Sequence, residues 1–97
     1  MKTTSPVRKS RIIFYDLRLN GEMLLASMQP ENGQYAVCYR GVRIGETKTI
    51  DDGLVLIMGS LKKDLSERIQ EGQRAQEILD GLGNDPKKLK KYRLRRD

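Results

Sequence analysis

The dipeptide Asn20-Gly21 constrains the fold of this chain more than any other feature, because both residues tolerate a positive φ. Such a pair favours the two-residue type I′ turn that joins neighbouring antiparallel strands. Every second residue before the turn is apolar, and these residues share one face of a strand: Ile13, Tyr15, Leu17 and Leu19. The pattern predicts a β-hairpin with strands over residues 11–19 and 22–28.

Further strand signals follow along the chain. Residues 30–33 (Pro-Glu-Asn-Gly) predict a turn, and residues 34–40 again alternate in character. Gly41 and Gly45 bracket either a bent strand or a bulge. Residues 46–50 give a weaker strand signal.

The remaining patterns predict the end of the sheet and one long helix. Residues 51–53 (Asp-Asp-Gly) predict a turn, and residues 54–58 are continuously apolar, as in a strand covered on both faces. Ser60 is the expected N-cap of an amphipathic helix over residues 60–82. Within it, Gly72 either weakens the helix by about 1 kcal/mol relative to alanine or permits close approach to the sheet.

These elements predict an α+β fold: a four- or five-stranded antiparallel meander sheet packed on one long amphipathic helix, with a basic C-terminal arm. Residues 11–83 would form a single domain between a flexible basic N-terminal arm (1–10) and a basic arm or short helix (84–97). Asp85-Pro86 favours a helix start there, but the run of like charges predicts disorder until a partner binds. Apolar area left over by so small a fold is also consistent with a homodimer.

Length and residue usage restrict the class of protein. A chain of 97 residues has room for one thin core. The single cysteine, Cys38, excludes an internal disulfide and fits a reducing compartment. No secretory leader is recognisable, and the longest apolar run, residues 54–58, is far shorter than the ~20 residues of a membrane span. We therefore expect a cytoplasmic protein with no membrane partner.

The residue types argue against catalysis. The sequence contains no histidine, so the commonest general base and metal ligand is missing. Cys38 occupies an alternating strand position and is expected to be a small buried hydrophobe. The glycine pair Gly41 and Gly45 is not followed by the Gly-Lys-Ser/Thr of a phosphate-binding loop. We expect no enzyme activity, no cofactor and no metal.

Positive charge is concentrated at the two ends. Residues 1–11 contain four Lys/Arg and no acid, residues 12–86 contain eight Lys/Arg against twelve Asp/Glu, and residues 87–97 contain seven Lys/Arg against one acid. Basic ends on a mildly acidic body are typical of arms that contact a polyanion, although a solubilising tail gives the same pattern. The candidate phosphate contacts are Arg8, Lys9, Arg11, Lys87, Lys88, Lys90, Lys91, Arg93, Arg95 and Arg96.

Aromatic rings could add stacking to these contacts. Tyr92 either stacks on a base or packs against the body. The N-terminal bases would extend the C-terminal surface only if the first strand lies near it. A second candidate surface combines Arg40 and Arg43 with rings of the sheet, but we expect those rings to fill the core instead: Phe14, Tyr15, Tyr35 and Tyr39.

The charge pattern favours a non-catalytic nucleic-acid-binding accessory protein whose tails make sequence-independent phosphate contacts, with either DNA or RNA. On this hypothesis, deletion of residues 85–97 should abolish binding and leave the fold intact. The alternative is a small protein-interaction module, such as a subunit, adaptor or inhibitor, that docks on a larger protein through its sheet edge or its helix.

Overall fold

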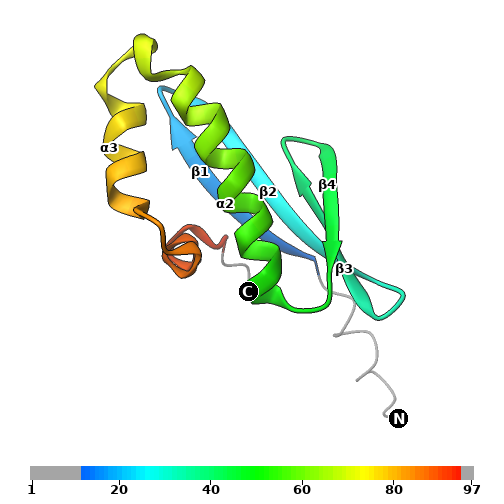
Figure 1. Ribbon diagram of the computed structural model, residues 1–97. Helices are drawn as coiled ribbons and strands as arrows, with labels where there is room; N and C mark the ends of the chain where they lie inside the picture. The colour runs from blue at the N-terminus through cyan, green and yellow to red at the C-terminus, as the bar shows by residue number, and fades with distance from the viewer. Residues whose placement is uncertain (1–11, 95–97) are drawn as a thin grey trace.

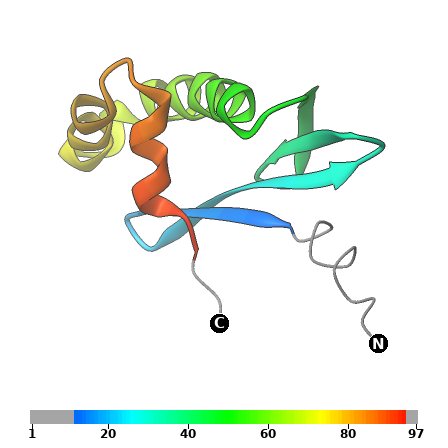
Figure 2. The same ribbon diagram turned by 90° about the horizontal axis from the view of Figure 1, so that it is seen from below.

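A computed structural model describes residues 12–94 of the chain and shows four strands in a single antiparallel meander. The strands follow one another in space as in the sequence: β1 (Ile13–Leu19), β2 (Glu22–Glu31), β3 (Gln34–Tyr39) and β4 (Val42–Thr47). Helices then cover one face of the sheet, and no described helix lies on the other face (Figures 1 and 2). The expected α+β class is therefore confirmed, with four strands.

Each hairpin turn consists of a residue with positive φ followed by glycine. Asn20-Gly21 has φ values of 51° and 86°, which confirms the predicted turn. The second turn is Asn32-Gly33, and the residues before it extend β2 to Glu31. The third turn places Arg40 at a φ of 53° before Gly41. A short glycine-containing turn of this kind matches the twist of the strands on either side, and it sets the register of the residue pairs next to it in each hairpin.

The first helix begins earlier than the sequence pattern predicts. Helix α2 spans Ile50–Glu67, and the Thr49 hydroxyl caps it by accepting a hydrogen bond of 3.1 Å from the backbone N–H of Asp52. Strand β4 ends at Thr47, so three predictions are wrong beyond that residue: the strand over residues 46–50, the turn over 51–53 and the strand over 54–58. Ser60, the expected N-cap, lies inside the helix. A short apolar run has no periodicity of its own, so the run over residues 54–58 fits a helix as well as a strand. Val55, in the middle of that run, is 54% exposed.

The predicted single helix over residues 60–82 is two helices with a break. After α2, the chain makes a 3₁₀ turn, η1 (Ile69–Glu71), and then enters α3 (Gln73–Leu82). Gly72 lies between them with a φ of 149°, a backbone conformation that favours glycine. Helix α3 returns alongside α2 (Figure 1), so Gly72 serves as the corner of a helical hairpin rather than as a weak point in one helix.

The core lies between the helices and one face of the sheet. Alternate residues of β1, β2 and β3 share one core with the buried stripe of α2, and α2 itself lies mainly over β3 and β4. The stripe consists of Leu54, Ile57, Met58, Leu61 and Leu65. Tyr15 and Tyr39 belong to this core, and Tyr35 packs against it, as expected for these rings. Phe14 does not pack on the core, because the alternation of β1 places its side chain on the face of the sheet that points away from the helices. Its partner across the strand pair is Ser27 of β2.

The face of the sheet that points away from the helices carries a mixture of side chains. Cys38 lies there and is only half-buried, so the expectation that it is a small buried hydrophobe is wrong. Residues of β2 alternate between the two faces as those of β1 do, and Met23 lies on this face with 45% of its surface exposed. No described helix is long and apolar enough to cross a membrane.

Candidate nucleic-acid interface

The basic C-terminal segment is a helix that packs on the body of the protein. Residues Pro86–Tyr92 form a 3₁₀ helix, η2, whose start is capped by a hydrogen bond of 3.0 Å from the Lys87 N–H to the Asp85 carboxylate. A 3₁₀ helix has three residues per turn, so Pro86, Leu89 and Tyr92 share one side. Leu89 is 1% exposed, and Tyr92 is half-buried against the core. The expected loose C-terminal arm is therefore wrong for this segment, although Asp85 and Pro86 do start a helix.

The same periodicity turns the lysines outward. Four lysines and the arginine that follows η2 are exposed, and we call them the C-terminal basic surface: Lys87, Lys88, Lys90, Lys91 and Arg93. Within residues 12–94, the only ion pair on this surface joins Lys90 to Asp51 of α2, at 3.9 Å. The Lys91 ammonium lies 5.3 Å from the centre of the Tyr92 ring. The positive charge of this surface is thus almost uncompensated by described carboxylates.

Beyond η2, the chain pairs with the first strand. Arg93 forms an antiparallel bridge with Tyr15, and the Leu94 N–H donates a hydrogen bond of 2.8 Å to the Phe14 carbonyl oxygen. The start of β1 therefore lies beside the C-terminal basic surface, which is the proximity that the sequence left open. The other candidate phosphate contacts lie outside the described residues: Arg8, Lys9, Arg11, Arg95 and Arg96.

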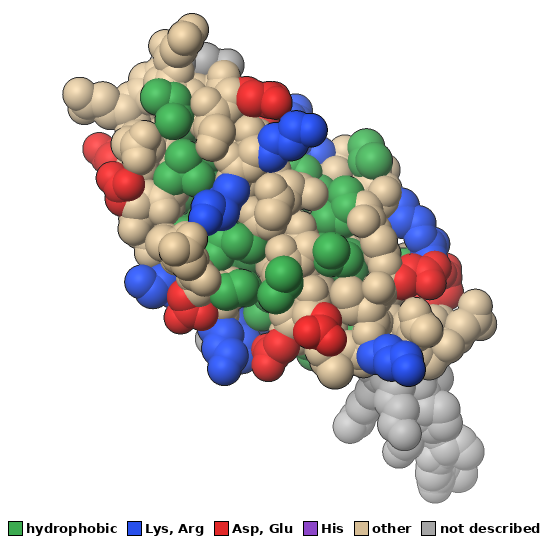
Figure 3. All heavy atoms as spheres, viewed as in Figure 1, with side chains coloured by type: hydrophobic (Ala, Val, Ile, Leu, Met, Phe, Trp, Pro, Cys, Tyr) green, Lys and Arg blue, Asp and Glu red, His purple; other side chains and the backbone are tan. Residues whose placement is uncertain are grey.

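The two candidate arginines of the sheet have carboxylate partners. Arg40 donates to Glu22 at 2.6 Å and to Asp64 at 3.3 Å. Arg43 contacts Glu31 at 3.1 Å and also pairs with Glu46 of its own strand. Figure 3 shows acidic and basic side chains interspersed over the face that carries α2. Arg40 and Arg43 therefore differ from the C-terminal basic surface, because nearby carboxylates compensate their charges.

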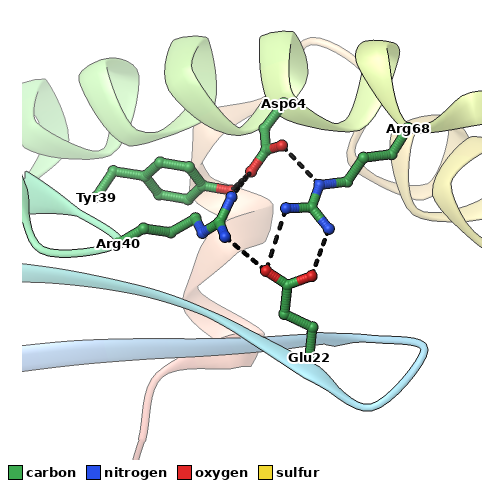
Figure 4. Close-up of polar contacts among 5 residues, drawn as sticks. All are labelled: Glu22, Tyr39, Arg40, Asp64 and Arg68. Atoms are coloured by element: carbon green, nitrogen blue, oxygen red, sulfur yellow. Dashed lines mark hydrogen bonds and ion pairs between the residues drawn. The ribbon is translucent and has the colours of Figure 1, made fainter.

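Arg40 belongs to a cluster of polar side chains that joins three parts of the fold, the Glu22 network (Figure 4). Arg68, which caps the C-terminal end of α2, donates two hydrogen bonds to the Glu22 carboxylate, at 2.6 and 3.2 Å, and a third to Asp64 at 2.7 Å. The Tyr39 hydroxyl donates to the other Asp64 oxygen at 2.7 Å. The network thus ties the start of β2 and the end of β3 to the last turns of α2. Sequence reasoning did not find it, because most partners lie far apart along the chain.

The ionisation of the Glu22 network follows from these contacts. Hydrogen bonds from Arg68 lower the pKa of Glu22 below its ordinary value. Burial alone raises the pKa of Asp64, but the hydrogen bonds that it accepts from Arg68 and Tyr39 outweigh burial and lower it. Burial, followed by the hydrogen bond to Asp64, raises the pKa of Tyr39. Glu22 and Asp64 are therefore charged and Tyr39 is neutral at neutral pH, as in a structural ion-pair network.

The lowered pKa values predict how stability depends on pH. Glu22 and Asp64 bind protons less readily in the folded state than in the unfolded state. Their contribution to the free energy of unfolding is therefore fully present above their unfolded-state pKa values, and it is lost as the pH falls through their folded-state pKa values. The free energy of unfolding should therefore fall below about pH 4.5, and Arg68→Gln should make this fall shallower. Urea unfolding from about pH 6 to about pH 2 measures both. Arg74→Gln, which removes an exposed pair with Glu77, is the control; an equal flattening there would contradict the assignment.

No other site chemistry is evident in the described part of the chain. Residues 12–94 contain no group of three or more Cys, Asp or Glu side chains that could hold a metal ion. Comparisons with protein-family models, with curated proteins and with solved structures gave no match to this chain. The C-terminal basic surface is therefore the feature on which a functional proposal can best be built.

Proposed function

We propose that this chain is a non-catalytic nucleic-acid-binding accessory protein that holds phosphates on its C-terminal basic surface. One observation carries the proposal: five exposed bases lie together on and beside η2 with a single weak ion pair among the described residues. Lys and Arg that contact phosphates release condensed counterions, and this release supplies affinity that does not depend on sequence. The body, residues 12–86, carries eight bases against twelve acids and would not compete for phosphate.

The docked state of η2 supports the proposal in a second way. A disordered arm loses conformational freedom when it binds, and the cost of ordering it reduces the affinity. The buried Leu89 side chain and the backbone contacts with β1 already fix the bases of this surface. The lysines therefore contact phosphate without a folding step, and only their side chains become ordered.

The structure also decides which variant tests the proposal. Deletion of residues 85–97 would remove Leu89 from the core, so loss of binding could reflect loss of the fold. Exchanging Lys87, Lys88, Lys90 and Lys91 for glutamine removes four charges and leaves the inward side of η2 intact. Exchanging four exposed bases elsewhere for glutamine removes the same charge and is the matched control: Arg18, Lys48, Lys63 and Arg74.

The measurement is fluorescence anisotropy with single- and double-stranded DNA and RNA over a series of salt concentrations. We expect the η2 variant to bind at least about tenfold more weakly at ~0.1 M salt than the unaltered chain. On duplex DNA the slope of log K against log salt should become shallower by about 3 to 4. The control variant should keep most of the affinity. Equal losses in both variants would show that only net charge matters, and would overturn the assignment to η2.

A second candidate function is a protein-interaction module. Among residues 12–94, no strand pairs with the outer edge of β4, where Val42 is 64% exposed, and no helix covers the face of the sheet that carries Met23. Both features favour this function. If the unaltered chain binds none of the four nucleic acids at moderate salt, this function replaces the first one.

A further inference from the structure

The two edges of the sheet differ in how far they are covered. On the outer side of β1, Arg93 pairs with Tyr15, and the Leu94 N–H bonds to Phe14. On the outer side of β4, no residue between 12 and 94 forms a strand pair. An unpaired edge strand presents backbone N–H and C=O groups that can bond to another strand.

A bulge gives β4 an unusual arrangement of charge. Arg43 lies opposite Cys38 and Glu46 lies opposite Ala36, while the register shifts between Val37 and Cys38 so that Ile44 is the extra residue. In a regular strand, residues three apart point to opposite faces. Because of the bulge, Arg43 and Glu46 both lie on the face away from the helices, in agreement with the ion pair between them.

The outer positions of the strand complete a symmetric pattern. Val42 lies opposite Tyr39 and Thr47 lies opposite Tyr35, and both tyrosines belong to the side of the sheet that packs on the helices. From either end, β4 therefore begins with a residue on the helical face (Val42 or Thr47), followed by a charged residue on the other face (Arg43 or Glu46). The bulge lies in the middle of the strand. A strand with this pattern matches a second copy of itself in antiparallel orientation.

We propose that β4 pairs with β4 of a second copy about a two-fold axis between Ile44 and Gly45, which joins two four-stranded sheets into one. In this register each Arg43 lies opposite Glu46 of the other copy, and each Val42 lies opposite Thr47 of the other copy. Opposite charges directly across an antiparallel pair are stabilising, and like charges are destabilising. A parallel pairing in register would place Arg43 on Arg43, so the charges select the antiparallel one.

The side chains around the axis are compatible with this dimer. Arg43 contacts Glu31 and Glu46 of its own chain, and a guanidinium has five N–H donors, enough to serve a further carboxylate. Leu56 of α2 packs against Gly45, where an added Cβ would lie only 2.8 Å from its Cδ1 atom. Leu56 is half-buried in the single chain, and the partner copy would cover its exposed part.

The dimer does not depend on nucleic-acid binding. The C-terminal basic surface lies beside β1, at the other edge of the sheet, so it stays exposed in both copies. The proposal can therefore fail or succeed separately from the proposed function.

Charge reversal tests the proposal on the full chain. Arg43→Glu and Glu46→Arg each place two like-charge contacts across the axis, and each should raise the dimer dissociation constant by about tenfold or more. An equimolar mixture of the two variants should dimerise again, because every acid at these positions then faces a base. Light scattering after gel filtration measures the mass, and sedimentation over about 10–500 µM protein gives the dimer dissociation constants of the unaltered chain, of each variant and of their mixture.

A second ion pair provides the control. Arg74 and Glu77 of α3 are also three residues apart, exposed and paired at 3.4 Å. Arg74→Glu and Glu77→Arg should leave the dimer constant unchanged. A monomer at all concentrations would overturn the proposal and show that the bulge and charges protect the edge from pairing. Dimers that persist in both β4 variants, or a mixture that stays monomeric, would equally overturn it.

Discussion

Replacing Leu89 with alanine should lower the free energy of unfolding by about 2–5 kcal/mol, even though Leu89 lies in the most basic stretch of the chain. Its side chain is 1% exposed and belongs to the same core as the leucines of β1 and α2. Removal of one methine carbon and two methyl carbons from such a position leaves a cavity as well as a loss of buried apolar surface. For a domain of this size the midpoint of thermal unfolding should fall by about 10 °C or more.

Leu94→Ala is the matched control for this prediction. Leu94 follows the same basic segment but is 41% exposed, so its replacement should change the free energy of unfolding by less than about 0.5 kcal/mol. Urea unfolding followed by circular dichroism measures both variants. If Leu89→Ala were as mild as Leu94→Ala, η2 would not be part of the cooperative fold, and the ordered presentation of its lysines would lose its basis.

One substitution at two glycines of α2 should have opposite effects on stability. Gly59 is exposed, and an added Cβ there meets no atom within 4 Å. Gly59→Ala should therefore stabilise the protein by about 0.5–1 kcal/mol, because alanine loses less conformational freedom in a helix. At Gly53 an added Cβ would lie 2.5 Å from the Sδ atom of Met28, a side chain with no exposed surface.

The clash should outweigh the helix preference at Gly53. Overpacking a core costs about 1–3 kcal/mol, against at most about 1 kcal/mol gained, so Gly53→Ala should destabilise the protein. Met28→Val shortens the obstructing side chain, and the double variant should be more stable than the sum of the two single effects implies. Chemical unfolding of the four variants completes the cycle. Stabilisation by Gly53→Ala alone would contradict the close approach of α2 to β2.

Local signals account for much of the sheet. Asn20-Gly21 and Asn32-Gly33 provide the positive φ values that their turns require, and the alternation between them gives the register. The same reasoning failed at residues 54–58, because a short apolar run reads alike in a buried strand and in a helix. Thr49, a good N-cap residue four positions before Gly53, was the signal that could have placed the start of α2 correctly.

The basic residues of the candidate interface were predicted, but their position on a helix packed against the core was not. Charge alone predicts the lysines of residues 87–91. Packing of Tyr92 against the body was only one of two alternatives, and the run of like charges favoured a disordered segment over a docked helix. Helix propensity of a short basic segment is indeed too weak to order it in isolation. Packing of Leu89 and Tyr92 overrides that weakness, and such packing is a property of the whole fold rather than of the segment.

The bridge between Tyr15 and Arg93 also has a consequence for how the protein is made. Strand β1 leaves the ribosome early, but the residues that cover its outer edge are synthesised only after both helices. Once β2 has paired with β1, the outer edge of β1 stays free until then, and its closure requires a contact between nearly opposite ends of the described chain, which is slow to form. The growing chain therefore remains open to mispairing along this edge of β1 until the basic segment emerges. In the finished protein, this same contact would make unfolding of the first strand and of the last helical turn a single event.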